Sequence, residues 1–158
     1  MYAAYDALSE PMKALVKDIK TWSVGDRKKL SQGDKMGSAE KGRYVGNEKM
    51  AAKVQDPGDL VTESAHPLVR THPETGRKAL YLGNHVQTLH GFKSAEAKPL
   101  IDYLQAHSVF PEFTCRFRWE VGSMAIWDNR CTQHRALNDY QGQRRRMHRI
   151  TIAGDAPF

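Results

Sequence analysis

The residues best suited to chemistry lie near the end of the chain, where one histidine precedes two arginines. His134 is followed by a polar turn and then by the basic run that contains Arg145 and Arg149. Because side chains alternate faces along a strand, these two arginines would point the same way, about 13 Å apart at roughly 3.3 Å per residue. Guanidinium groups bind carboxylates, sulfonates and sulfates through paired hydrogen bonds. The spacing therefore predicts a site for two anions, with His134 across the turn.

Short strands are expected to position these side chains. Apolar and polar residues alternate over 113–120, which predicts a strand. Two further strands are expected over 123–128 and 147–152. The apolar face of the first strand would consist of Phe113, Cys115, Phe117 and Trp119.

The earlier part of the chain predicts helices and one hairpin. Apolar residues recur at helical spacing over 2–22, and proline interrupts the pattern, so we expect two short helices, the second capped by Ser9. Residues 67–71 and 78–82 predict a hairpin, and residues 94–107 predict a helix capped by Ser94. Residues 23–59 are rich in polar residues and predict a surface insertion, with one helix near 48–54. Several short strands with a crossing helix indicate a β-sandwich or jelly roll.

Length and composition limit the possible classes. A chain of 158 residues fits one domain. Its two cysteines, Cys115 and Cys131, lack the spacing of a metal or redox site, so both are expected to be buried apolar residues. No apolar run is long enough to cross a membrane and the start has no export signal, so we expect a cytoplasmic protein. The net charge of +6 fits nucleic acid, an anionic surface or small anionic substrates.

The candidate site residues belong to a longer sequence pattern. Trp127-Asp128-Asn129-Arg130, then Thr132-Gln133-His134, Arg145 and Met147-His148-Arg149 resemble the C-terminal signature of the taurine dioxygenase and 2,4-dichlorophenoxyacetate dioxygenase family. The segment from His66-Pro67 to Arg70-Thr71-His72-Pro73 adds to the resemblance, which is nearly continuous except over 23–59. It implies a double-stranded β-helix core of the jelly-roll, cupin-like kind in an α+β, mainly β chain with flanking helices. Residues 1–158 would form the C-terminal part of one such domain, so the core would be incomplete.

The resemblance also implies roles for four residues. His134 would be a ligand of iron(II), and Arg145 would bind the distal carboxylate of the co-substrate 2-oxoglutarate. Arg149 would face the acidic group of the substrate, and His85 falls where the family lines its substrate pocket. The implied reaction hydroxylates the carbon beside a sulfonate, sulfate ester or carboxylate, and consumes O2 and 2-oxoglutarate to give succinate and CO2. With a sulfonate, the hydroxylated product releases sulfite.

One part of the family pattern is missing. The family holds iron(II) with two histidines and one carboxylate, and it takes the first histidine and the carboxylate from a His-x-Asp pair. The only histidine here with an acid two residues later is His72, before Pro73-Glu74, and the turn residues explain that string without a metal. We therefore expect the pair to lie upstream of Met1, and we expect this chain alone to show no turnover.

Three alternatives remain open. The chain could be an inactive or binding-only remnant, or its substrate could be an alkyl sulfate or an aryloxyacetate. A nucleic-acid face is disfavoured because no nucleic-acid module accompanies the basic residues. Loss of half a barrel would expose apolar surface, which promotes association into a homo-oligomer. The basic residues concerned are Arg116, Arg118, Arg130 and Arg144 to Arg146.

Overall fold

Two short helices begin the chain. The computed structural model describes residues 1–24, 63–137, 139–154 and 158. Helix α1 spans Tyr2–Asp6 and helix α2 spans Glu10–Val16. Ser9 caps α2, because its hydroxyl accepts a hydrogen bond from the Met12 amide at 3.4 Å, and proline lies in the first turn, where its missing N–H has no helical partner. The predicted helix pair and the Ser9 cap are confirmed, but the helical prediction over 2–22 is too long, because α2 ends at Val16 and a strand begins at Lys20.

A three-stranded antiparallel sheet follows in the order β2-β1-β5. Its strands are β1 (Lys20–Val24), β2 (Glu63–Pro67) and β5 (Val86–Leu89). The central strand β1 pairs Thr21 with His66 of β2 and with Leu89 of β5. This sheet was not predicted, since β2 reads Glu-Ser-Ala-His-Pro and has no apolar alternation. The predicted insertion over 23–59 begins within β1, and the remainder of it, including the predicted helix near 48–54, lies outside the described residues.

A hairpin forms where the sequence predicted one. Strand β3 (Val69–Thr71) pairs antiparallel with β4 (Lys78–Leu80), and Arg70 lies opposite Ala79. The turn needs Gly76, whose φ of +67° is a conformation that residues with a Cβ rarely adopt.

Helix α5 (Ser94–Ser108) covers the sheet and the first helices. The predicted cap at Ser94 is wrong by one residue: the N-cap is Lys93, whose amide donates to the Glu96 carboxylate at 3.0 Å, and Ser94 is the first residue of the helix. A short 3-10 helix, η2 (Pro111–Phe113), follows it. The helix is not a membrane span: nowhere in the described residues is a helix long and apolar enough to cross a bilayer.

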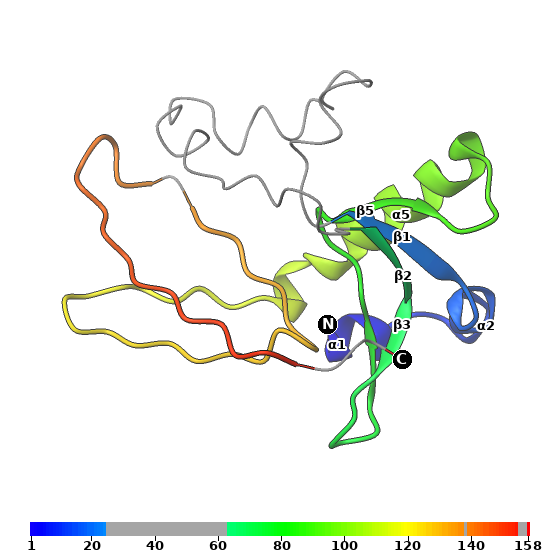
Figure 1. Ribbon diagram of the computed structural model, residues 1–158, viewed down its shortest axis with the longest axis horizontal. Helices are drawn as coiled ribbons and strands as arrows, with labels where there is room; N and C mark the ends of the chain where they lie inside the picture. The colour runs from blue at the N-terminus through cyan, green and yellow to red at the C-terminus, as the bar shows by residue number, and fades with distance from the viewer. Residues whose placement is uncertain (25–62, 138, 155–157) are drawn as a thin grey trace.

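The core lies between α1, α5 and the two sheets (Figure 1). Leu104 of α5, Val16 of α2 and Ala4 of α1 are fully buried, and Leu68, Leu80 and Leu89 are almost so. His107 of α5 is buried as well, and its Nε2 bonds to the Ala4 carbonyl at 2.7 Å, which ties α5 to α1. The first helices and α5, which are far apart in the sequence, therefore share one core.

Residues 114–154 differ from the rest of the structure. Their described part contains neither helix nor strand and runs outward as long open loops (Figure 1). The strands predicted over 113–120, 123–128 and 147–152 are wrong for this structure, because an extended segment becomes a strand only where a neighbour satisfies its backbone groups. Ile126, Ile150 and Ile152 are each at least 90% exposed. Cys115, predicted to be buried, is exposed for the same reason, whereas Cys131 is half-buried.

Candidate functional site

His134 lies beside Trp127 in the loop that carries the Trp-Asp-Asn-Arg string. The two rings are 5.0 Å apart between centroids and tilted by 51°. The Trp127 indole N–H donates to Asn129 Oδ1 at 2.9 Å, which fixes the orientation of the indole. The His134 side chain is exposed, as is most of its loop. The local packing therefore places an imidazole against an aromatic ring at the surface.

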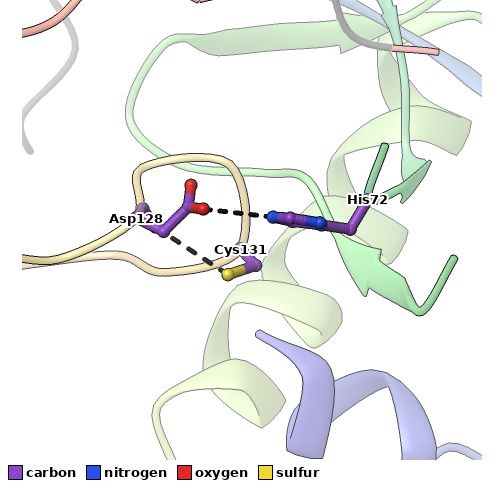
Figure 2. Close-up of side chains that lie close together, drawn as sticks. All are labelled: His72, Asp128 and Cys131. Atoms are coloured by element: carbon purple, nitrogen blue, oxygen red, sulfur yellow. Dashed lines mark hydrogen bonds and ion pairs between the residues drawn. The ribbon is translucent and has the colours of Figure 1, made fainter. Parts of the chain in front are cut away.

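His72 anchors this loop to the turn of the β3–β4 hairpin. Its ring is buried, and Nδ1 accepts hydrogen bonds from the backbone amides of Glu74 and Thr75, both at 3.3 Å. An Nδ1 that accepts carries no proton, so the neutral ring has its proton on Nε2. That nitrogen lies 3.1 Å from Asp128 Oδ2 and donates to it (Figure 2). His72 thus bridges the hairpin turn and the loop.

Arg130 completes the same connection. Its Nε and Nη2 donate to the Asp128 carboxylate, at 3.0 Å and 2.7 Å to Oδ2, while Nη1 donates to Glu74 Oε1 at 2.8 Å. Hydrogen bonds from Arg130, and next from His72, hold the pKa of Asp128 well below its usual range. We call His72, Glu74, Asp128 and Arg130 the hairpin clamp. In this structure Asp128 fastens the loop to the hairpin turn.

The hairpin clamp shares His72 and Asp128 with a potential metal cluster, but the donor atoms of these two residues are occupied. Ligand atoms of His72, Asp128 and Cys131 all lie within 4.8 Å of one another. Both nitrogens of His72 are hydrogen-bonded, however, and the Asp128 carboxylate is paired with Arg130. The Cys131 thiol contacts the Asp128 carbonyl at 3.9 Å (Figure 2). These contacts account for the cluster as a fastening between two segments.

The described residues do not by themselves fit an iron(II) centre. Such a centre requires two imidazoles and a carboxylate around one point. Within the part of the chain that the structure describes, the cluster at His72 is the one group of three or more potential ligands, and His134 is not among them. A ligand set containing His134 would need residues beyond those described.

His85 lies close to the segment that precedes His134. The His85 ring is half-buried and 5.5 Å from the Tyr81 ring. A Cβ on Gly83 would lie 3.1 Å from the His85 ring and 3.5 Å from Gln133 Nε2, so the side chains of His85 and Gln133 converge over this glycine. The structure therefore brings His85, a predicted pocket residue, next to Gln133, which precedes the predicted ligand His134.

Arg145 and Arg149 stand apart from this arrangement. Both are exposed in the open loop, and the described residues give neither of them a hydrogen bond or an ion pair. The two arginines were expected to lie on the same face of a strand, and that strand does not form here. Their roles remain predictions.

One residue that sequence reasoning did not single out is Arg70. It lies in β3 and is only 3% exposed. No local sequence signal marked it, because arginines are mostly exposed and the burial of this one depends on tertiary packing.

Residues 1–151 match the family model described as taurine catabolism dioxygenase TauD, TfdA family. The chain belongs to the TauD/TfdA family. This match includes His85, His134, Arg145 and Arg149, together with the hairpin clamp.

Several curated TauD/TfdA relatives are similar over nearly the whole chain. The chain is 38% identical over 159 residues to the alpha-ketoglutarate-dependent sulfate ester dioxygenase of Pseudomonas putida, covering 98% of this chain and 48% of the relative. It is 33% identical over 159 residues to a putative alpha-ketoglutarate-dependent sulfonate dioxygenase of Schizosaccharomyces pombe, covering 99% of this chain and 36% of the relative. The chain thus spans about half the length, or less, of these relatives.

Solved TauD/TfdA structures are similar in fold as well. A taurine dioxygenase from Burkholderia xenovorans aligns with a TM-score of 0.59 and 31% identity, over 82% of this chain and 36% of that one. The AAD-2 structure in complex with Mn(II) and N-oxalylglycine aligns with a TM-score of 0.54 and 28% identity, over 76% of this chain and 41% of that one.

Proposed function

We propose that this chain forms one side of the reaction pocket of an iron(II)- and 2-oxoglutarate-dependent dioxygenase that acts on a small organic sulfonate or sulfate ester. The observation that carries the proposal is the family match over residues 1–151, which contains all four predicted pocket residues. The convergence of His85 and Gln133 over Gly83 supports it, because it brings two distant parts of the match together.

Each pocket residue has a task that suits its chemistry. The His134 imidazole is one ligand of iron(II), and the rest of the ligand set belongs to the length that the relatives have beyond this chain. Arg145 holds the distal carboxylate of 2-oxoglutarate through paired hydrogen bonds, and Arg149 does the same for the acidic group of the substrate. His85 lines the substrate side. O2 and 2-oxoglutarate are consumed, succinate and CO2 are formed, and the substrate carbon beside the anion is hydroxylated.

The open loops become strands in this proposal. Residues 113–120, 123–128 and 147–152 join a double-stranded β-helix when neighbouring strands are supplied. Arg145 and Arg149 then lie on one face, with the basic neighbours Arg144 and Arg146 on the other. The exposed apolar side chains of Ile126, Ile150 and Ile152 are the surface that such neighbours would cover.

A chimera tests the arginine roles. The portion of the Pseudomonas putida relative that matches this chain is replaced by this chain, and succinate formation is followed with alkyl sulfates and alkylsulfonates as substrates. Arg145→Met should raise the KM for 2-oxoglutarate by roughly 10- to 100-fold, since it removes a charge-assisted pair of hydrogen bonds. Arg149→Met should raise the KM for the sulfur substrate by a similar factor and leave that for 2-oxoglutarate unchanged.

Matched controls lie on the opposite strand face. Arg144→Met and Arg146→Met remove the same charge from adjacent positions and should leave both KM values within about twofold of the parent chimera. Equal effects of Arg144→Met and Arg145→Met would contradict the assignment, because they would show that total charge is what matters. Circular dichroism of each variant confirms that the chimera is folded.

A further inference from the structure

Arg70 is a buried cation in the hairpin. It lies in the middle of β3, opposite Ala79 of β4, and only 3% of it is exposed. An arginine remains protonated at all ordinary pH values, so burial cannot be relieved by loss of its proton. A buried charge of this kind is expected to have a counter-charge.

No such counter-charge is present within the described residues. Arg70 Nε and Nη2 are buried and have no hydrogen-bond partner. The ion pairs that the structure describes use other cations. The Arg70 guanidinium packs against an aromatic ring, with its carbon 5.4 Å from the centre of the Tyr81 ring. Two strong donors are therefore left unsatisfied in the protein interior.

The two unsatisfied nitrogens form a complete binding edge. Nε–H and one Nη2–H of a guanidinium point in parallel and match the two oxygens of a carboxylate. Arg130 in the hairpin clamp shows this use within the same chain, since its Nε donates to Asp128 Oδ1 at 3.0 Å and its Nη2 donates to Asp128 Oδ2 at 2.7 Å. Arg70 presents the same edge without an acid.

Two rings lie near Arg70, those of Tyr81 and His66. His66 of β2 packs edge-on against the Tyr81 ring, with centroids 5.7 Å apart. Burial, and next the charge of Arg70, lower the pKa of His66, and the neutral form of an imidazole can donate one hydrogen bond. Such a wall favours an oxyanion over a cation or an apolar group.

We propose that Arg70, with His66 and Tyr81 beside it, forms a second anion site that binds a small carboxylate through the Nε–Nη2 edge. The site does not depend on the proposed function, because it uses neither His134 nor the Arg145–Arg149 pair. Its occupant is a free small acid, for which formate is the simplest probe.

Formate titration of the chain tests the proposal at constant ionic strength, with sodium formate replacing sodium chloride. A ligand that binds only the folded state raises the melting temperature in a saturable way, here by about 3–6 °C. Arg70→Met keeps the length of the side chain and removes the charge, so it should abolish this rise. Lys78→Met removes a charge from an exposed position of the same hairpin and should respond as the parent chain does.

A direct readout uses the Nε–H resonance of Arg70 in ¹H–¹⁵N spectra, assigned by its absence in Arg70→Met. Binding should move this resonance with the same midpoint as the melting curve. The proposal is overturned if formate leaves the resonance in place while parent and Arg70→Met melt alike across the titration. A resonance already at a hydrogen-bonded position and insensitive to formate would also overturn it, because a carboxylate of the polypeptide would then occupy the edge.

Discussion

The hairpin and helix region, residues 63–108, contrasts with the open loops over 114–154. Both contain alternating apolar residues, yet the first forms strands and a buried core while the described part of the second forms neither. The difference lies in neighbours. Strands β1, β2 and β5 satisfy one another, and α5 covers them, whereas the open loops have no adjacent strand in the described structure. Alternating apolar and polar residues give a segment one apolar face. The segment forms a strand only where a neighbouring strand pairs with its backbone.

The hairpin clamp is the point where the two regions meet. It fastens the loop at Asp128 to the turn of the β3–β4 hairpin through His72 and Arg130. The loop that carries His134 is therefore held at one end even though its strands are absent. Local polar contacts therefore hold this loop in place although it has no strand around it in the described residues.

Hydrogen exchange should show the largest difference between the two regions. Backbone amides paired in β1 and inside α5 should exchange slower than those of residues 114–127 by on the order of 1,000-fold or more, since only the former need core opening. Exchange followed by mass spectrometry measures both in one experiment. Equal protection would mean that the open loops are paired strands in solution.

Shortening an apolar side chain should lower the free energy of unfolding in the core and leave it nearly unchanged in the open loops. Leu104 is fully buried, so Leu104→Ala should lower the free energy of unfolding by about 2–5 kcal/mol. Ile126 is 90% exposed, so Ile126→Ala should change it by no more than about 0.5 kcal/mol. Urea denaturation of the two variants gives the comparison, and a large loss for Ile126→Ala would show that the loop apolar face is covered.

The hairpin clamp should contribute less than the core. His72→Ala removes hydrogen bonds to two backbone amides and to Asp128 from a buried position, and should lower the free energy of unfolding by about 1–3 kcal/mol. His90 is exposed, so His90→Ala is the matched control and should be neutral. A neutral His72→Ala would show that the loop is not fastened in solution.

The smallest effect concerns pH. Since Arg130 and His72 lower the pKa of Asp128 in the folded protein, its contribution to stability is complete above the ordinary carboxyl range near about pH 4. It is lost as the pH falls through the lowered folded-state value. The stability difference between the parent and Asp128→Asn should therefore be constant above about pH 5 and shrink in acid. A difference that grows in acid would contradict this sign.

The sequence predicted elements that depend on local signals. The Ser9 cap, the turn at Gly76 and the period of 94–107 all act within a few residues, and each is confirmed. Strand β2 was missed because it forms by pairing with β1, which adjoins it in space but not in sequence, and its described side chains are exposed or half-buried, so they show no apolar alternation.

Prediction of the site was limited because the positions of its side chains depend on neighbouring strands and on tertiary packing. Residue types and spacing singled out His134, Arg145 and Arg149, but the strand that would align the arginines is absent here. The buried state of Arg70 depends on tertiary packing, so its chemistry became visible only in the structure.

The most direct test of the account is iron- and 2-oxoglutarate-dependent succinate formation by the Pseudomonas putida chimera and its His134→Ala variant, with His90→Ala as control. The account predicts turnover in the parent and the control, and loss to the level without iron in His134→Ala, because an imidazole that holds the metal has no substitute. Turnover that survives in His134→Ala would contradict the claim that this residue is an iron ligand.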